Sequence, residues 1–309
     1  MKNNTLINTC NRVMDSICSL LRAKNVSTRL KMGFILITVL PVIAVGYFSY
    51  MQGSKAIYNK MKRSATETID QVGINLGSKL QAIINDGTEI AYNDLVQKTL
   101  VNYDSLSARE LNIIEDELSD YINRKYIFSN NVAEIIIYTN DLERINAYGQ
   151  SMFWFMPKPE NLKFLAEKAR ELDGLCLWIP VNSDYEQGLA RKVFGDRKSI
   201  ILMRNIKSLE TGNQIGYILM RIDESVISDT LKNIDFGDGA QIFILNSNNF
   251  VVSSAGNYAE VALPYHETGI LNEINQGNGD RSFRHRLGKN LYLAAYSPIK
   301  QADWYIVAL

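Results

Sequence analysis

A long uncharged segment near the start of the chain limits the possible folds more than any other feature. Between Met32 and Ser54 the sequence has no acidic or basic side chain and includes the run GFILITVLPVIAVGYFSYM. A helix needs about 20 predominantly apolar residues to cross the hydrocarbon core of a bilayer. The segment therefore predicts a transmembrane helix over residues 32–54, within which a proline is tolerated.

The residues around this segment predict its orientation. Residues 1–31 carry six basic side chains and one acidic side chain, and positive charge is retained on the cytoplasmic side. A cleaved signal peptide would have a shorter apolar core that ends in small residues, whereas Tyr47, Phe48 and Tyr50 stand here. We expect residues 1–31 to be cytoplasmic, the helix to lie in a bacterial plasma membrane, and the chain beyond about Ser54 to be extracytoplasmic. Within the first segment, residues 1–25 fit either an interfacial amphipathic helix or an extension without a role.

Composition excludes several classes of protein. The 309 residues include 33 basic and 33 acidic side chains, whereas a dedicated nucleic-acid-binding protein would concentrate positive charge. Cys10 and Cys18 precede the membrane segment and Cys176 alone follows it, which excludes a disulfide within the extracytoplasmic part. Cys176 lies in the apolar run LCLWIPV, so we expect a buried structural cysteine. Neither a metal nor a cofactor is expected.

Helical periodicity continues beyond the membrane segment. Apolar residues recur at steps of three or four from Ile57 to Ile90, which predicts one long stalk helix. A second helix is predicted to start at Ser107, because this serine and Glu110 have the spacing of a capping box. Residues 55–130 are assigned to the stalk and this second helix.

A β-rich region with two helices occupies residues 131–235. The runs VAEIIIYTND, RINAYGQ, LCLWIPV, SIILMRNI and QIGYILMRI predict its strands. One helix is predicted to open near Pro159 and to stop at Gly174, and a short helix is predicted to be capped by Asp223.

A smaller β-rich unit occupies residues 236–309. AQIFILN and FVVSSA predict a hairpin, and SFRHRLGKNLYLAAYSPI and ADWYIVAL complete an antiparallel sheet. The stalk helix and the segment from Thr268 to Ile274 are expected to cover this sheet. The fold class is α+β, with two antiparallel-sheet units after the stalk.

This order of elements resembles the double Cache sensory domain, which implies that the two antiparallel-sheet units are PAS-like. The opening STRLKMGFILITVLPVIAVGYFSYMQGSKAI is similar to that of YesM-like sensor histidine kinases. The AQIFILNSNNFVVSS hairpin and the ending YSPIKQADWYIVAL are similar to the membrane-proximal unit of the same kinases. The resemblance covers roughly Val26 to Leu309, and it implies a membrane-distal unit in residues 131–235 and a membrane-proximal unit in residues 236–309.

The resemblance implies a function in signal transduction. It implies the input half of a two-component sensor histidine kinase, with a carbohydrate-type signal that binds directly or is presented by a solute-binding protein. Such kinases continue into a second transmembrane helix and a kinase core, so we expect the sequence to be truncated at Leu309. The chain as given is therefore not expected to be catalytic. His266 and His285 do not resemble a phosphoacceptor site, and both are predicted to be surface residues. A homodimer through the stalk helix is expected, which charged substitutions at Leu76 and Leu80 should disturb.

Two alternatives remain open. The same sensor could be joined to a chemotaxis receptor or to a cyclic-dinucleotide enzyme. More remotely, the chain could be a membrane-tethered extracellular hydrolase that uses acids such as Asp184 and Glu186, although no nucleophile or metal-ligand motif accompanies them.

Aromatic and charged residues of the predicted distal unit are the candidate ligand-binding residues. Aromatic faces with one cation and one carboxylate could hold a sugar or a small zwitterion, although tryptophans in apolar runs also suit an ordinary core. An arginine at a strand end could instead form a surface ion pair with Glu210 or Asp223. The candidates are Tyr148, Trp154, Trp178, Asp184, Arg204 and Tyr217.

Overall fold

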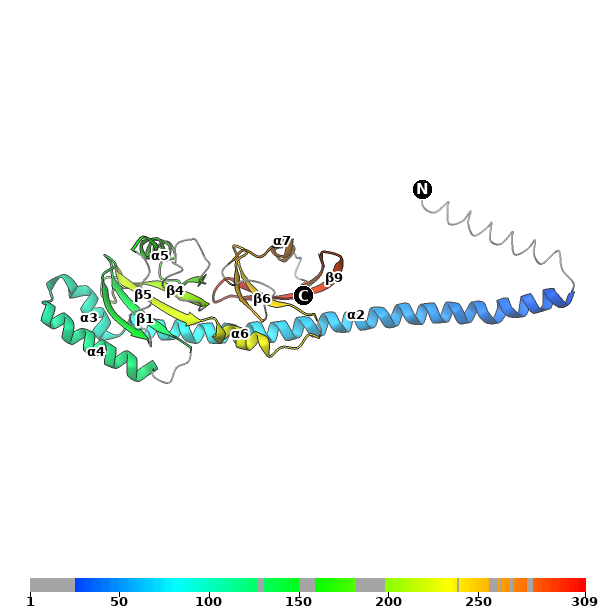
Figure 1. The fold of residues 1–309 in the computed structure, drawn as a ribbon, viewed down its shortest axis with the longest axis horizontal. Coiled ribbons are helices and arrows are strands. Elements are labelled where there is room, and N and C mark those ends of the chain that lie inside the picture. The colour runs from blue at the N-terminus through cyan, green and yellow to red at the C-terminus, as the bar shows by residue number, and fades with distance from the viewer. Residues whose placement is uncertain are drawn as a thin grey trace. The chain divides into compact units, whose positions relative to one another are not determined.

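The computed structural model describes residues 26–126, 131–149, 159–181, 198–237, 239–255, 261, 263–266, 269–276 and 280–309. The chain divides into two compact units, Met1–Met61 and Lys62–Leu309. One long helix and two five-stranded antiparallel sheets form the described fold (Figure 1). The predicted α+β class, with a long apolar N-terminal helix and two PAS-like sheets, is confirmed.

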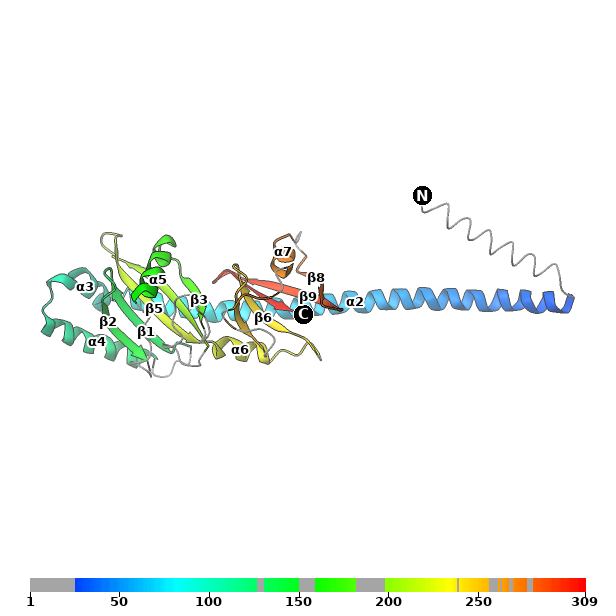
Figure 2. The ribbon, with the colours of Figure 1, turned by 45° about the horizontal axis from the view of Figure 1, so that its top comes forward.

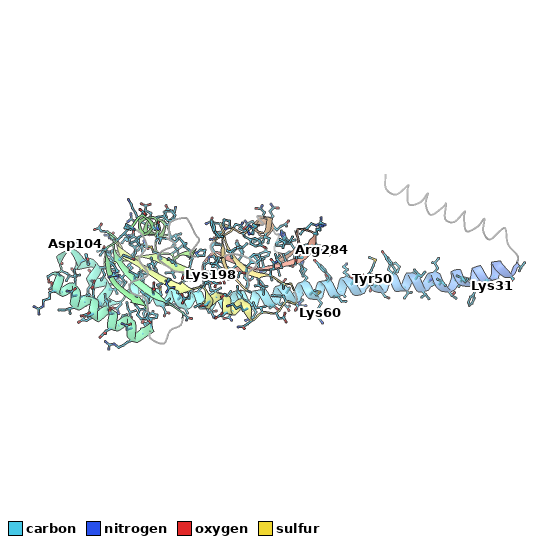
Figure 3. All side chains as sticks on the ribbon, viewed as in Figure 1. Lys31, Tyr50, Lys60, Asp104, Lys198 and Arg284 are labelled. Atoms are coloured by element: carbon cyan, nitrogen blue, oxygen red, sulfur yellow. The ribbon has the colours of Figure 1, made fainter. Side chains whose placement is uncertain are left out.

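Helix α2 (Val26–Ala91) begins with the apolar segment and has Pro41 inside it. Among the described residues, it alone is long and apolar enough to cross a membrane. Its apolar side chains in this part are exposed, for example Phe34, Val42 and Phe48. Figure 3 shows side chains projecting from the helix between the labelled Lys31 and Tyr50. Because apolar side chains exposed to water are unfavourable, this surface is suited to the hydrocarbon of a bilayer.

The second part of α2 belongs to the core of the unit Lys62–Leu309. Ile69, Leu76, Leu80, Ile83 and Ile90 are buried in one apolar cluster with residues of both sheets. Charged residues at the two leucines would therefore disrupt the fold of this unit, so these positions cannot test a dimer contact separately.

Two shorter helices and a 3-10 turn follow α2. Helix α3 (Asp94–Asn102) was not expected from the sequence. The 3-10 turn η1 (Tyr103–Ser105) and helix α4 (Ala108–Tyr126) come next. The predicted capping box of α4 is confirmed, because the Ser107 amide and hydroxyl both donate to Glu110 Oε2, at 2.8 and 2.6 Å.

The first sheet, sheet A, has the strand order β2-β1-β5-β4-β3. Its strands are β1 (Glu134–Thr139), β2 (Arg144–Gly149), β3 (Leu177–Val181), β4 (Ser199–Lys207) and β5 (Gln214–Asp223). A close approach occurs at Gly216, where a Cβ atom would lie 2.4 Å from the carbonyl oxygen of Tyr138, so only glycine fits there.

Residues alternate between the two faces of sheet A. One face, which includes Leu202 and Met220, packs in the cluster that contains α2. The opposite face, which includes Met203 and Leu219, packs against α5 (Pro159–Glu171). This helix ends at Glu171, three residues before the predicted stop at Gly174, whose φ of 98° favours glycine in the turn that follows.

The second sheet, sheet B, has the order β7-β6-β10-β9-β8, so the last strand lies at its centre (Figure 2). Its strands are β6 (Ile242–Asn246), β7 (Val251–Ser254), β8 (Ser282–Leu287), β9 (Asn290–Ile299) and β10 (Trp304–Ala308). One face packs in the cluster with α2, and the other packs against α7 (Gly269–Gln276), as the sequence predicted.

Two sequence predictions about single residues are wrong. Asp223 does not cap the short helix α6 (Ser225–Lys232), because it ends β5 and its carboxylate forms an ion pair with Arg221. His285 is not a surface residue, since its side chain is buried beside α7 and makes an edge contact with Phe283. His266 is exposed, as predicted.

Candidate functional site

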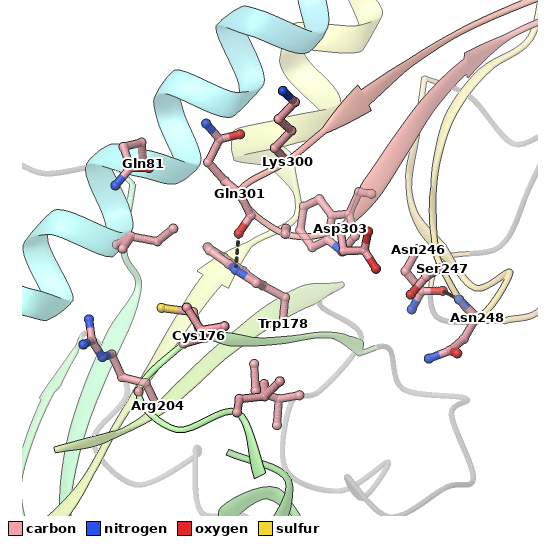
Figure 4. Close-up of a pocket in the computed structure, with 17 residues that line it drawn as sticks. Gln81, Cys176, Trp178, Arg204, Asn246, Ser247, Asn248, Lys300, Gln301 and Asp303 are labelled. Carbon is pink, nitrogen blue, oxygen red and sulfur yellow. Dashed lines mark hydrogen bonds between the residues drawn. The ribbon is translucent and has the colours of Figure 1, made fainter. Parts of the chain in front are cut away.

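A cleft of about 780 Å³ lies beside α2 where parts of both sheets meet. This inter-sheet cleft is lined from three directions (Figure 4). Helix α2 contributes Gln81 and Ile84, and sheet A contributes residues before and within β3 together with Arg204 of β4. The β6–β7 turn and the β9–β10 turn of sheet B contribute the remainder. The volume is in the range of small-molecule sites.

Trp178 forms the centre of the cleft floor. Its indole Nε1 donates a hydrogen bond of 3.2 Å to the carbonyl oxygen of Gln301, in the β9–β10 turn (Figure 4). Its ring packs edge-on against Trp304, with ring centroids 5.6 Å apart. The indole is 8% exposed, so Trp178 is both a core residue and part of the cleft surface.

Arg204 lies at the end of the cleft next to α2 (Figure 4). Its Nη1 donates to the hydroxyl of Thr88 at 2.7 Å, and this hydroxyl in turn donates to the carbonyl of Ile84. The guanidinium also lies 6.0 Å from the ring centroid of Tyr92, at the outer limit of a cation–π contact. The expected alternative, a surface ion pair with Glu210 or Asp223, is wrong because Arg204 is buried.

The sheet B side of the cleft is polar and held by local hydrogen bonds. The Asn246 side-chain oxygen accepts hydrogen bonds from the amides of Asn248 and Phe250, at 3.0 and 2.9 Å, which fixes the β6–β7 turn. Lys300 and Asp303 stand in the β9–β10 turn. The described residues of the lining therefore offer amides, one carboxylate and two cations.

Cys176 lines the cleft next to Arg204. Burial raises the pKa of its thiol, and the nearby Arg204 guanidinium partly opposes this effect. A raised pKa keeps the thiol protonated near neutral pH, so Cys176 is a poor nucleophile. The predicted structural role fits its half-buried position.

The structure brings together two of the six predicted ligand-binding residues, Trp178 and Arg204. Tyr217 is fully buried on the α5 face of sheet A, where its hydroxyl accepts a hydrogen bond from Arg170 at 2.9 Å. Tyr148 packs near α4, and its hydroxyl donates to the carbonyl of Tyr126. Neither tyrosine lines the cleft, so the structure does not bring them together with Trp178 and Arg204.

Trp154 and Asp184 lie outside the described residues. Among the described part of the chain, no group of three or more histidine, cysteine or acidic side chains could hold a metal ion. The sequence did not predict that Gln81 or the two turns of sheet B would line a site. The turn at residues 247–249 lies within the predicted AQIFILNSNNFVVSS hairpin, but only the tertiary arrangement brings it to the cleft.

The comparison with protein families agrees with this architecture. The family model of the Cache domain matches residues 53–309, which include both sheets and the stalk part of α2. The chain belongs to the Cache domain family. Cache domains sense extracellular ligands for receptors, so this chain contains a sensory domain. A search of curated proteins gave no match.

Solved ligand-binding and sensor domains of several receptors have the same fold. The ligand-binding domain of the Pseudomonas fluorescens chemoreceptor CtaA, in complex with L-isoleucine, has a TM-score of 0.56 at 12% identity, covering 82% of this chain and 93% of that chain. The sensor domain of the V. cholerae histidine kinase DctB has a TM-score of 0.51 at 11% identity, covering 82% of this chain and 97% of that chain. The ligand-binding domain of the Pseudomonas aeruginosa amino acid chemoreceptor PctC, in complex with GABA, has a TM-score of 0.52 at 11% identity, covering 80% of this chain and 98% of that chain. At these identities the similarity shows the fold alone.

Proposed function

We propose that the chain is the extracytoplasmic ligand-sensing half of a bacterial membrane receptor, with residues 1–31 in the cytoplasm. The observation that carries the proposal is a Cache domain whose first helix, α2, continues into an apolar segment long enough to cross a membrane. The basic residues before that segment support the orientation. The inter-sheet cleft is the proposed ligand site.

The proposed output is a cytoplasmic histidine kinase, and the proposed signal is carbohydrate-type. The resemblance of the opening and closing sequence motifs to YesM-like kinases supports this choice, and the DctB sensor domain shows that a similar fold serves a histidine kinase. The signal could bind directly or be presented by a solute-binding protein. The boundaries proposed for the membrane-distal and membrane-proximal units are 131–235 and 236–309.

A chemotaxis receptor is the second candidate. The ligand-binding domains of CtaA and PctC have the same fold and belong to chemoreceptors. The described residues contain no feature that distinguishes the two outputs, because both would receive the signal through the same helix.

The proposed mechanism is a two-state change in the relation between the sheets and α2. The cleft walls come from both sheets and from α2, so a ligand that contacts all three can favour one arrangement. It can do so only to the extent that it binds that arrangement more tightly. A homodimer through the exposed side of the stalk would pass the change to the membrane helix.

A hybrid receptor tests this function. Residues 1–309 are joined through a second membrane helix to a histidine kinase core, and autophosphorylation is measured with neutral sugars, sugar acids and amino acids added outside. A ligand-dependent change in phosphorylation supports the sensor. Constant phosphorylation with every ligand, in a hybrid shown to be inserted and folded, contradicts it.

A further inference from the structure

Arg204 is a buried cation without a counter-ion among the described residues. Its side chain is 9% exposed, and within the described part of the chain no carboxylate lies within ion-pair distance of its guanidinium. A guanidinium has five N–H donors. One is given to the neutral hydroxyl of Thr88, and the enclosed Nε has no hydrogen-bond partner among the described groups. Burial of an unpaired charge is strongly unfavourable, so such a site favours an anion.

The other charged residues described in the lining also favour an anionic ligand. Among the described residues, the lining of the inter-sheet cleft has two cations, Arg204 and the exposed Lys300, and one carboxylate, Asp303. Asp303 lies in the β9–β10 turn on the far side of Trp178 from Arg204 (Figure 4). These described charges therefore favour an anion at the Arg204 end of the cleft.

The remaining groups suit a polar body rather than an apolar one. Gln81, Asn246, Ser247 and Asn248 line the cleft with amides and a hydroxyl, while Trp178 supplies aromatic surface. Amides can donate to and accept from hydroxyl groups, and aromatic surface packs on the apolar face of a ring. These groups are arranged around the site from three different elements.

We propose that the inter-sheet cleft binds a small carboxylate-bearing molecule whose carboxylate is held by Arg204. Arg and carboxylate groups form strong, charge-assisted and often bidentate hydrogen bonds. This inference deepens the proposed function, on which it rests, by naming the chemical class of the ligand. Within a carbohydrate-type signal the class is a sugar acid; the same carboxylate also occurs in amino acids.

Isothermal titration of the full chain in lipid nanodiscs tests the proposal. The probes are D-galacturonate, its neutral counterpart D-galactose, and L-isoleucine. We expect D-galacturonate to bind and D-galactose to bind at least about tenfold more weakly, since the lost group is a charged hydrogen-bonding partner. If L-isoleucine binds through its carboxylate and D-galacturonate does not bind, the carboxylate-binding role of Arg204 stands and the ligand is an amino acid.

Two variants make the test specific. Arg204→Gln should weaken the binding of the carboxylate probe by about tenfold or more, with retained folding checked by circular dichroism. Lys300→Glu changes an exposed residue of the lining and should also weaken binding without loss of the fold. Lys289→Glu, in the β8–β9 turn and outside the cleft lining, is the matched control and should bind normally.

Three results would overturn the proposal. They are measurable binding of D-galactose with the same affinity as D-galacturonate, no binding of either carboxylate probe, and unchanged affinity for the bound carboxylate probe in both Arg204→Gln and Lys300→Glu. If the hybrid kinase nevertheless responds to a neutral sugar, the sensor function stands and only the ligand class is wrong. If the chain binds the carboxylate but the hybrid never responds, the proposed function fails and the ligand class stands.

Discussion

Trp178 of β3 donates its indole hydrogen bond to the carbonyl of Gln301, at 3.2 Å, and so connects sheet A to the β9–β10 turn of sheet B. The edge contact with Trp304 adds apolar area to the same junction. A buried hydrogen bond from Ser253 of β7 to Glu224, just before α6, connects the sheets at a second place. The floor of the inter-sheet cleft is therefore also the junction that a ligand could strengthen or weaken.

Trp178→Phe removes the donor and retains an aromatic ring. We expect the free energy of unfolding to fall by about 0.5–1.5 kcal/mol, as for an average hydrogen bond, and the β9–β10 turn to become more sensitive to protease. Urea unfolding in detergent micelles and limited proteolysis measure the two effects. Tyr148→Phe is the control, because it removes a hydrogen bond to Tyr126 that lies away from sheet B. Equal proteolysis of this turn in both variants would contradict the connecting role.

Arg221→Met should destabilise the chain far more than the loss of an exposed ion pair. Arg221 contacts Glu134 through two nitrogen–oxygen pairs of 3.1 and 3.2 Å, and both side chains are buried. Removal of one partner of a buried ion pair typically costs about 3–5 kcal/mol. Arg281→Met, at the partly exposed pair with Asp70, should cost about 0–1 kcal/mol. Chemical denaturation compares the two, and similar losses would show that burial does not decide the effect.

The capping box gives α4 a pH-dependent stability. Hydrogen bonds from Ser107 lower the pKa of the Glu110 carboxyl below 4.5 in the folded state. The stabilisation is therefore fully present above pH 4.5 and is lost as the pH falls through the lowered folded value. Thermal unfolding should show Glu110→Gln as less stable than wild type at neutral pH and equally stable in acid. Glu117→Gln, exposed in the middle of the same helix, should show no such convergence.

Cysteine cross-linking tests the proposed homodimer. Ile74 is 64% exposed on the stalk part of α2, so a partner stalk could cover it. In a chain whose native cysteines are replaced by serine, Ile74→Cys should form a disulfide-linked dimer in membranes under mild oxidation. Ile113→Cys, 51% exposed on α4, is the control and should remain monomeric. Equal cross-linking at both positions, on non-reducing gels, would count against contact through the stalk.

Much of the fold could be predicted from local patterns. Apolar periodicity identified the long helix, and the Ser107 and Glu110 spacing fixed the start of α4. Alternating and β-branched runs identified the strands, because these patterns are set by residues close together in the sequence. Helix α3 was missed because it has only nine residues and directly follows α2, although Asn93, whose side chain accepts a hydrogen bond from the Leu95 amide, marks its start.

The site could be predicted only in part, because it is built from residues far apart in the sequence. Tyr217 and Arg204 lie on neighbouring strands, yet their side chains point to opposite faces of sheet A. A shift of one residue in the register between β4 and β5 would place the two side chains on the same face, and local sequence patterns do not define this register. Likewise, His285 seemed suited to the surface, whereas the packing of α7 on sheet B buries it.

The most direct test of the account is the labelling rate of Cys176 in a chain whose Cys10 and Cys18 are replaced by serine. Because burial raises the thiol pKa, labelling by a maleimide should be slow near neutral pH and faster in alkali. The ligand that switches the hybrid kinase should slow it further, while a cysteine at exposed Ser105 keeps its rate. A kinase response without any protection of Cys176 would contradict ligand sensing in the inter-sheet cleft.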